Sequence, residues 1–203
     1  MRKVRICEMI LALVSLKGGV GKTTSAMHLA AVMVDDGRDA VVVDADTEQS
    51  ALRWAAYADN LPFRVVAAEQ DGLAQQARRE LRAGAYVVID TPPNNRELLM
   101  RASMVATHVI VPVLPTGLDI DRMMPTLRLL RDAQATREDL DIGILLTHWD
   151  KRKSLAAEAS AALAEYPVFG AKIRDLTRYE QAFGATPTYL VEYAQVYEEM
   201  KNG

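Results

Sequence analysis

The residues best suited to chemistry form one glycine-rich loop, Lys17 to Thr24 (KGGVGKTT). The loop follows an apolar run that is typical of a buried strand and precedes an apolar-periodic run that predicts a helix. Glycines let such a turn fold tightly and aim its N–H groups at one anion, and the helix N-terminus adds about half a positive charge. The loop therefore predicts a phosphate cradle, in which Lys22 reaches the β- and γ-phosphates of a nucleotide and the Thr23 hydroxyl ligates Mg²⁺.

The start of this loop departs from the usual phosphate-loop pattern, G-x-x-x-x-G-K-[ST]. The pattern requires glycine where the chain has Leu16, and the loop opens instead with a second lysine, Lys17. Because Lys22 already serves the phosphates of its own nucleotide, Lys17 is able to point away and neutralise the phosphates of a nucleotide on a facing subunit. This arrangement predicts a homodimer with nucleotide sandwiched between two chains. The alternative is an exposed lysine in an ordinary phosphate loop.

Three carboxylates stand where two further strands are predicted to end. Asp44 and Asp46 follow the second predicted strand, and Asp90 ends the fourth. Ligands of parallel α/β sheets bind at the carboxyl ends of the strands, so these side chains are expected near the phosphate loop. Asp90 is predicted to hold Mg²⁺ through a water or through Thr23. For Asp46, a catalytic role is open, and so is the alternative that Asp46 or Thr47 caps the following helix; the two do not exclude each other.

The elements that position these residues alternate along the chain. Strands are predicted at about 9–15, 39–44, 63–67, 85–90, 107–113, 141–147 and 167–173. Helices are predicted at about 22–36, 48–58, 71–83, 95–105, 118–134, 154–165, 175–183 and 188–201. Several strands are continuously apolar, which is typical of parallel strands buried on both faces. With right-handed crossovers they predict an α/β fold, a three-layer doubly wound, mostly parallel sheet in one domain spanning residues 1–203.

The octapeptide KGGVGKTT resembles the deviant Walker A loop of the ParA/MinD superfamily of P-loop NTPases. Similarity to the ParA branch of that superfamily extends from about residue 10 to about residue 187. The resemblance implies a short ParA-type partition ATPase that lacks an N-terminal DNA-reading domain. It also implies that Asp46, in a segment that is D-x-D-P-Q in the family, positions or polarises the attacking water, while Asp44 supports the Mg²⁺ shell or the loop. Thr47 replaces the proline of that segment and leaves both carboxylates in place.

The resemblance and the loop chemistry together imply ATP and Mg²⁺ as cofactors and define overlapping sets of residues. The catalytic residues are expected to be Lys17, Lys22 and Asp46, and the metal residues are expected to be Thr23, Asp46 and Asp90. The residues expected to bind ATP are Lys17, Gly18, Gly19, Val20, Gly21, Lys22, Thr23, Thr24, Thr147 and Arg174.

The last two of these residues follow the sixth and seventh predicted strands. The segment THWD at 147–150 is similar to the guanine-reading N/T-K-x-D pattern, but His148 replaces the lysine. The family favours adenine, so Thr147 is expected to contact an adenine base. Arg174 matches part of the adenine-pocket segment of ParA relatives, whose proline is missing here. After the fifth strand, Asp119 is expected to cap the helix that follows.

Composition limits the other possibilities. At 203 residues, half of them apolar, the chain has enough material for one packed α/β core. The net charge of −3 does not indicate a nucleic-acid partner, so any DNA affinity must come from a local patch. The single cysteine, Cys7, excludes a disulfide framework and a cysteine-based metal site, such as the cluster of nitrogenase iron-protein relatives. No apolar run approaches the ~18 residues that span a bilayer, so a cytoplasmic protein is expected.

The expected DNA face consists of two groups of cations. They are Lys151, Arg152 and Lys153 after the sixth predicted strand, and Lys172, Arg174 and Arg178 around the end of the seventh. The ParA resemblance places DNA-contacting arginines in both regions, whereas the alternative is an ordinary solvated charge cluster. The resemblance further implies an ATP-dependent switch whose dimer binds nonspecific DNA on the nucleoid. With a ParB-like or other adaptor, this dimer would segregate or position plasmid or chromosomal DNA or another large cargo.

Two other classes of function are weighed against this one. A MinD-like membrane-associated ATPase requires a basic amphipathic C-terminal helix, whereas the segment over 189–201 carries three glutamates and one lysine. A P-loop tyrosine kinase of the bacterial type carries a C-terminal tyrosine cluster, and Tyr189, Tyr193 and Tyr197 are present. Their spacing of four residues predicts one packed face of the last helix instead.

Overall fold

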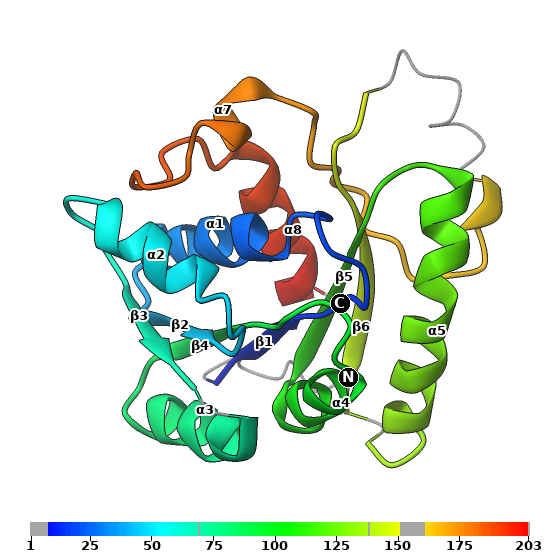
Figure 1. Ribbon diagram of the computed structural model, residues 1–203, viewed down its shortest axis with the longest axis horizontal. Coiled ribbons are helices and arrows are strands. Elements are labelled where there is room, and N and C mark those ends of the chain that lie inside the picture. The colour runs from blue at the N-terminus through cyan, green and yellow to red at the C-terminus, as the bar shows by residue number, and fades with distance from the viewer. Residues whose placement is uncertain (1–7, 69, 138, 151–160, 203) are drawn as a thin grey trace.

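Figure 1 shows a central sheet with helices on both of its faces. The computed structural model describes residues 8–68, 70–137, 139–150 and 161–202. The strands are β1 (Ile10–Leu13), β2 (Ala40–Asp44), β3 (Arg64–Ala67), β4 (Tyr86–Asp90), β5 (His108–Val113) and β6 (Asp141–Leu146). They lie in the order β3-β2-β4-β1-β5-β6, and every neighbouring pair is parallel. The predicted doubly wound parallel sheet is confirmed.

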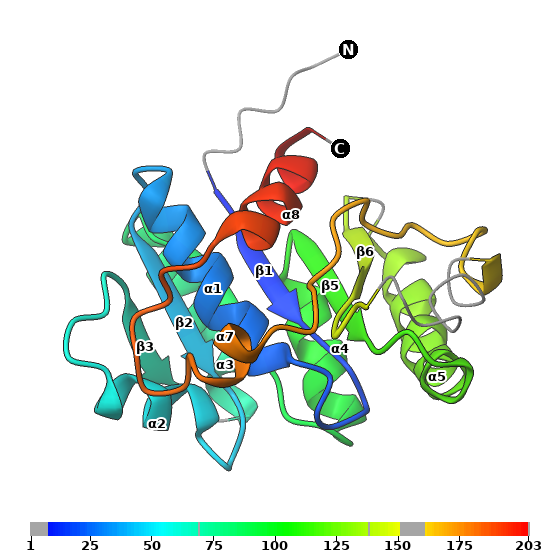
Figure 2. The ribbon, with the colours of Figure 1, turned by 90° about the horizontal axis from the view of Figure 1, so that it is seen from above.

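Two layers of helices cover this sheet. The described helices are α1 (Lys22–Asp35), α2 (Ser50–Tyr57), α3 (Leu73–Arg82), α4 (Arg96–Val105), α5 (Gly117–Gln134), α7 (Thr177–Glu180) and α8 (Val191–Asn202), with a 3-10 turn η1 (Gln70–Gly72) before α3. Helices α1, α2 and α8 cover one face, and α3, α4 and α5 cover the other (Figures 1 and 2). Because a crossover helix runs antiparallel to the strands that it connects, the helix that follows each strand begins at the carboxyl edge of the sheet.

Side chains of each strand alternate between two apolar cores. On β1, Ile10 and Ala12 pack on the α3–α4–α5 side, while Leu11 and Leu13 pack on the α1–α8 side. Burial on both faces explains why the central strands are continuously apolar in sequence. Asp44 and Asp90, the last residues of β2 and β4, are paired in register and buried at the carboxyl edge. The fold therefore brings two carboxylates together beside the phosphate loop.

The C-terminal helix α8 packs its tyrosines inward. Tyr193 and Tyr197 are each 1% exposed, and their hydroxyls hydrogen-bond Ser25 at 3.1 Å and Asp36 at 3.0 Å, respectively. The predicted packed face is confirmed for these two tyrosines, whose buried hydroxyls do not suit the accessible phosphate acceptors of a kinase tail. Tyr189 precedes α8, and its hydroxyl accepts a hydrogen bond from Arg174 at 2.5 Å. In the part of the chain that the structure describes, no helix is long and apolar enough to cross a membrane.

One predicted strand differs from the structure. The segment over 167–173, predicted as a seventh strand, forms one isolated bridge to β6, between Val168 and Ile144. The N–H groups of Gly170 and Ala171 donate to the carboxylate of Glu199 in α8, at 2.7 and 2.8 Å, so they do not extend a ladder along β6. The predicted helix over 154–165 lies largely outside the described residues.

Candidate nucleotide-binding site

The phosphate loop joins β1 to α1 at the carboxyl edge of the sheet. Gly19 and Gly21 have left-handed backbone angles, with φ of 72° and 86°, which other residues rarely adopt. Gly21 is the N-cap of α1, and no side chain caps this helix start. The N–H groups of the first helical turn and the helix dipole are therefore available to an anion, as a phosphate cradle requires.

Lys22 is the buried cation of this loop. It is 7% exposed, and its Nζ donates to the carbonyl oxygen of Lys17 at 3.0 Å. Burial lowers the pKa of Lys22, while the negative charges of Asp90 and Asp46 act in the opposite direction. A phosphate in the cradle would add negative charge and favour the charged ammonium. The geometry therefore suits a lysine whose ligand is an anion.

Thr23 and Asp90 form the candidate metal corner. The Thr23 hydroxyl donates to Oδ2 of Asp90 at 2.6 Å. Within the described residues, Oδ1 of Asp90 is buried without a hydrogen-bond partner. Burial raises the pKa of Asp90 to about 7, against the effect of the hydrogen bond from Thr23. An orphaned carboxylate oxygen beside a hydroxyl suits Mg²⁺, a hard cation that prefers oxygen ligands.

The described residues contain no group of three or more His, Cys, Asp or Glu side chains arranged to hold a metal ion. Mg²⁺ commonly takes only one or two protein carboxylates and completes its shell with water and substrate phosphates. The corner formed by Thr23 and Asp90 therefore fits a magnesium ion that arrives with a nucleotide.

Asp44 and Asp46 shape the loop between β2 and α2. Asp44 is buried and accepts hydrogen bonds from the N–H groups of Asp46 and Leu52, both at 3.0 Å. Asp46 accepts a hydrogen bond from the N–H of Glu48 at 3.0 Å and lines the cavity beside the phosphate loop. Helix α2 begins after Gln49 without a side-chain cap, so Asp46 is not the cap of this helix. Asp44 thus supports the loop, and Asp46 is at the cavity.

A cavity of about 390 Å³ lies beside the phosphate loop. It is lined by Gly18, Gly19, Gly21, Lys22, Thr23, Thr24, Asp46, Glu48, Ser50, Thr91, Pro93 and His148. Seven of these residues were predicted from the sequence as site residues. The other five, Glu48, Ser50, Thr91, Pro93 and His148, were not, because only the order of the strands brings their loops to the phosphate cradle. Thr91 had a local signal, since it directly follows Asp90 at the end of β4.

A smaller cavity of about 50 Å³ adjoins the loop near α7 and includes Thr147 and Arg174 in its walls. Thr147 is buried, and its hydroxyl donates to the carbonyl oxygen of Val20 at 3.0 Å, which ties the phosphate loop to the end of β6. His148 lines both cavities and has φ of 50°, and its Nδ1 lies 3.5 Å from the carboxylate of Asp175. The two cavities are thus adjacent at His148, and the prediction that Thr147 and Arg174 contact the base stays a prediction.

Arg174 is held by its own chain. Its guanidinium forms an ion pair with Glu192 and donates to the Tyr189 hydroxyl at 2.5 Å. Glu192 is 5% exposed and also accepts a hydrogen bond from the Tyr179 hydroxyl at 2.5 Å. Burial would raise the pKa of Glu192, but the hydrogen bonds from Tyr179 and Arg174 hold it below its ordinary value. Sequence patterns did not identify this network, whose members meet only in the folded chain.

The other described cations of the expected DNA face lie against aromatic rings. Lys172 Nζ is 3.9 Å from the centre of the Trp149 ring, and the Arg178 guanidinium is 4.1 Å from the centre of the Tyr189 ring. Both are cation–π contacts that leave the charged groups near the surface. The first group of predicted cations, Lys151, Arg152 and Lys153, lies outside the described residues.

Lys17, the lysine expected to reach across a dimer, is paired within its own subunit. Its Nζ donates to Oδ1 of Asp119 in the first turn of α5. The Thr116 hydroxyl donates to Oδ2 of Asp119 at 2.6 Å. Burial would raise the pKa of Asp119, but the hydrogen bonds from Lys17 and Thr116 hold it below its ordinary value.

The prediction that Asp119 caps this helix is wrong. The cap is Thr116, whose hydroxyl accepts the N–H of Asp119 at 3.1 Å. Because α5 begins at Gly117, Asp119 occupies the third helical position. There its carboxylate accepts from the Thr116 hydroxyl and from the Lys17 ammonium.

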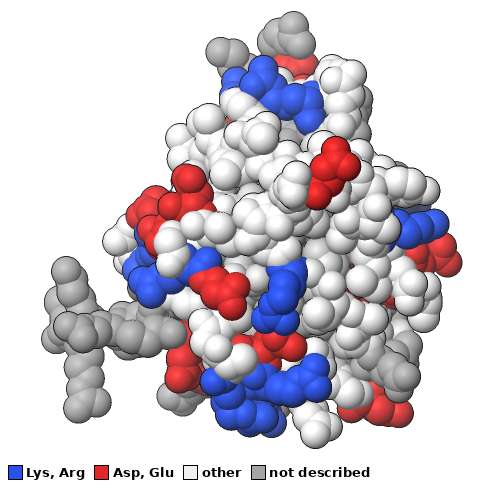
Figure 3. Space-filling view, turned by 90° about the vertical axis from the view of Figure 1, so that its left-hand side faces the viewer, with Lys and Arg blue, Asp and Glu red and all other residues white. Residues whose placement is uncertain are grey.

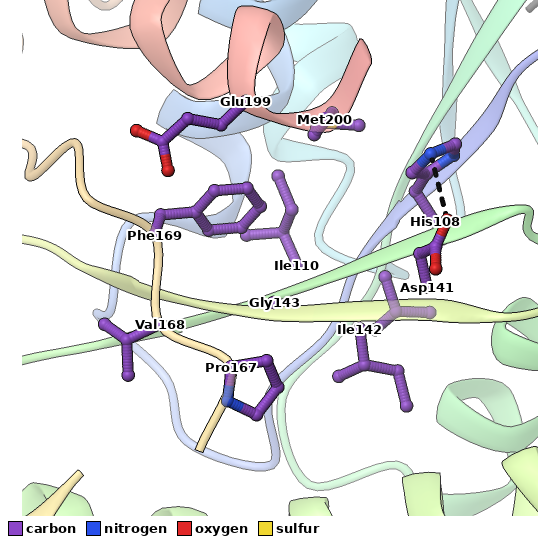
Figure 4. Close-up of a pocket in the computed structure, with 11 residues that line it drawn as sticks. His108, Ile110, Asp141, Ile142, Gly143, Pro167, Val168, Phe169, Glu199 and Met200 are labelled. Atoms are coloured by element: carbon purple, nitrogen blue, oxygen red, sulfur yellow. Dashed lines mark ion pairs between the residues drawn. The ribbon is translucent and has the colours of Figure 1, made fainter. Parts of the chain in front are cut away.

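A third cavity, of about 370 Å³, lies at the amino ends of β5 and β6 beside α8 (Figure 4). Phe169 packs over Gly143, where any side chain would meet the ring. At the rim, Nε2 of His108 is 3.6 Å from the Asp141 carboxylate, and burial lowers the pKa of His108. This cavity contains none of the predicted site residues. The phosphate-loop cavity, where charged groups converge, is therefore the candidate site.

Comparison with known proteins agrees with this geometry. Residues 11–185 match the family model of the CobQ/CobB/MinD/ParA nucleotide-binding domain. The chain is 32% identical over 177 residues to the maintenance of carboxysome distribution protein A of Gloeobacter kilaueensis, covering 85% of this chain and 80% of that protein. It is 30% identical over 196 residues to the chromosome-partitioning ATPase Soj of Thermus thermophilus, covering 80% and 78%. A solved Cyanothece McdA variant in complex with ATP is similar in fold, with a TM-score of 0.73 at 18% identity, covering 97% and 95%.

The matched region begins in β1 and extends past α7, so it contains the phosphate loop, the carboxylates at the ends of β2 and β4, and every residue that lines the phosphate-loop cavity. The relatives that match most of the chain include a chromosome-partitioning ATPase and a carboxysome-distribution protein. The resemblance predicted from the loop sequence is confirmed: this chain belongs to the CobQ/CobB/MinD/ParA family of nucleotide-binding domains.

Proposed function

We propose that this protein is a single-domain, Mg²⁺-dependent ATPase that hydrolyses ATP slowly and works as a molecular switch. In the ATP state it forms a homodimer, binds nonspecific DNA and positions DNA or another large cargo together with a ParB-like or other adaptor. It acts in the cytoplasm, and its ATP form associates with the nucleoid. The observation that carries the proposal is the different placement of two lysines in one loop. Lys22 is buried and lines the phosphate cavity, whereas Lys17 is partly exposed and is paired with Asp119 of α5.

The charges around the cavity favour a nucleoside triphosphate with its metal ion. The Lys22 ammonium and the uncapped start of α1 attract the β- and γ-phosphates. Thr23, Asp90 and Asp46 supply oxygen atoms for Mg²⁺, and Oδ1 of Asp90 has no competing partner in the described residues. When bound, the ion would neutralise charge that develops on the phosphates during transfer.

Hydrolysis requires one water to be held in line with the γ-phosphate. Asp46 is at the cavity wall, where its carboxylate is able to accept a hydrogen bond from this water and orient it. Asp44 fixes the Asp46 backbone through the 3.0 Å hydrogen bond and so positions that carboxylate. This division of roles assigns catalysis to Asp46 and positioning to Asp44.

The dimer places Lys17 of each subunit against the nucleotide of the other. Lys17 is 28% exposed and lies next to the start of α5, where Leu118 exposes 60% of its surface. An exposed apolar side chain beside the cation that opens the phosphate loop favours a contact between subunits. Release of Lys17 from Asp119 would then accompany dimerisation. Doubling the cations of the DNA face in the dimer would make tight DNA binding dependent on ATP.

Nucleotide binding and light scattering test this proposal with two variants. Lys22→Ala is expected to abolish ATP binding, because the phosphates lose their buried counter-charge. Lys17→Ala is expected to bind ATP largely as the wild type does and to lose ATP-dependent dimerisation. Lys201→Ala, which removes a lysine at the end of α8, serves as a charge-matched control and is expected to retain both properties. A Lys17→Ala protein that dimerises like the wild type would contradict the sandwich arrangement.

A further inference from the structure

Figure 3 faces the β3 edge of the sheet and shows Lys and Arg side chains gathered in the lower part of the molecule, where α3 lies. We call this group the α3 arginine cluster; it consists of Arg64 at the start of β3 and Arg78, Arg79 and Arg82 on α3. All four residues are exposed. The opposite side of the helix is buried through Leu73, Ala77 and Glu80. The cluster is therefore the outward face of a helix that is firmly packed on the sheet.

The charge of this cluster is poorly balanced. Glu80, whose side chain is 8% exposed, accepts from Arg64 at 2.8 Å and lies 3.6 Å from Arg79. Within the described structure, Arg78 and Arg82 form no ion pair. Four guanidinium groups thus meet one carboxylate, on a chain whose net charge is −3. A local excess of positive charge on an acidic protein is the electrostatic footprint of a polyanion-binding surface.

The expected DNA face is less available by comparison. Of its described cations, Arg174 is paired with the buried carboxylate of Glu192, and Lys172 and Arg178 lie over aromatic rings. By contrast, Arg78 and Arg82 lie one helical turn apart, about 6 Å along the axis. Two guanidiniums at this spacing are able to hold separate phosphates of a nucleic-acid backbone, each through paired N–H donors.

We propose that the α3 arginine cluster is a second DNA-contacting face, which binds backbone phosphates without reading sequence and without requiring ATP. Arg82 precedes β4 by only a few residues, and Arg64 begins β3, so the cluster lies at the amino edge of the sheet. The phosphate loop and Asp90 lie at the carboxyl edge. Binding at the cluster is therefore separated from nucleotide binding and from the lysine that is proposed to cross the dimer.

The chemistry of the surface favours DNA over other anions. The C-terminal end of a helix carries a partial negative charge, so a single small anion would gain little there. A polyanion contacts several arginines at once and releases condensed counterions. A membrane surface would require outward apolar groups for insertion, but the apolar side chains of α3, Leu73 and Ala77, are buried. A DNA backbone meets these conditions.

This inference rests on the proposed function for the identity of the polyanion. It adds that the ADP form keeps a weak, salt-sensitive hold on DNA, whereas the ATP dimer binds more tightly through the expected face. A protein that releases its cargo on hydrolysis would then remain close to DNA. Experiment can distinguish DNA binding by the α3 arginine cluster from DNA binding by the expected face of the dimer, because only the second requires ATP.

Fluorescence anisotropy with a random-sequence duplex, in ADP and at increasing salt, tests the inference. Wild-type protein is expected to bind with a log–log salt slope of about −0.9 for each neutralised phosphate. The double variant Arg78→Gln/Arg82→Gln is expected to bind about tenfold more weakly at about 50 mM salt and to flatten the slope by about two units. The matched control is Arg128→Gln/Arg131→Gln, which removes two exposed arginines from α5 and is expected to bind within about twofold of wild type.

Three outcomes would overturn the inference. They are no binding by the wild type in ADP, equal losses in the two double variants, and loss of binding to phosphatidylserine vesicles in the α3 variant without loss of DNA binding. Retention of ATP-dependent DNA binding by the α3 variant would leave the proposed function intact. Conversely, ADP-state binding in a protein that never dimerises with ATP would support the cluster and contradict the sandwich dimer.

Discussion

Replacing Asp119 with asparagine is expected to strengthen ATP-dependent dimerisation. In the structure the Asp119 carboxylate holds the Lys17 ammonium within the same subunit. The proposed dimer needs that ammonium at the phosphates of the partner's nucleotide, so each subunit must break this pair before it gains the new one. Asparagine keeps the size of the side chain and one acceptor oxygen for the Thr116 hydroxyl, but removes the negative charge.

The size of the effect follows from the exposure of the pair. Lys17 is 28% exposed and the Asp119 side chain is 8% exposed, so the pair is neither freely solvated nor fully buried. Exposed ion pairs contribute about 0.2–1 kcal/mol, and hydrogen bonds to charged groups contribute about 1.5–3 kcal/mol. Discounting for the solvent at Lys17, we estimate about 1 kcal/mol per subunit, or about 2 kcal/mol per dimer. This corresponds to about a 30-fold lower dissociation constant for the dimer.

Sedimentation velocity over a protein concentration series, with ATP and Mg²⁺, measures this constant directly. The variant should also carry Asp46→Ala to prevent turnover, and it should be compared with Asp46→Ala alone. Asp121→Asn is the matched control, because it removes an exposed carboxylate from the same helix and should leave the constant unchanged. If the Asp119→Asn/Asp46→Ala dimer is no tighter than the Asp46→Ala dimer, then Asp119 does not compete with the partner's nucleotide for Lys17. A weaker dimer would mean that Asp119 orients Lys17 for the partner instead.

Two further predictions concern hydrolysis and pH. Asp46→Ala is expected to bind ATP, to accumulate as a trapped dimer and to release no phosphate; undiminished phosphate release would move the catalytic role to another residue. Burial lowers the pKa of His28 from about 6.5 to about 4. Between these two pH values the unfolded chain binds a proton at His28 more readily than the folded chain does. Acidification from about pH 6.5 to about pH 4 should therefore lower the free energy of unfolding by about 3 kcal/mol. His28→Phe should lack this loss, which urea unfolding at several pH values would detect; parallel pH curves for the two proteins would speak against it.

Local patterns were sufficient for the strands and for the phosphate loop. The apolar runs before Lys17 and Asp90 end at the carboxyl edge of a parallel sheet, and this geometry alone brings the loop and the carboxylate together. The segment over 167–173 was wrongly predicted as a strand, because its apolar pattern does not reveal that Glu199 of α8 captures two of its N–H groups. Contacts between segments distant in sequence determine whether such an apolar run forms a strand, and local sequence patterns do not contain information about these contacts.

The same reasoning explains why the two surfaces proposed to bind partners were partly missed. Lys17 and Asp119 each had a local interpretation, as a lysine facing a partner and as a helix cap, and their pairing appears only when α5 is packed beside the loop. In the sequence, the arginines of α3 look like those of any solvated helix, and the net charge of −3 conceals them. Their excess charge becomes visible because folding buries Glu80 on Arg64 and leaves Arg78 and Arg82 without a counter-charge in the described structure. The net charge of a whole chain therefore does not exclude a DNA-binding face. Whether neighbouring carboxylates are buried or exposed determines how much positive charge a local surface presents.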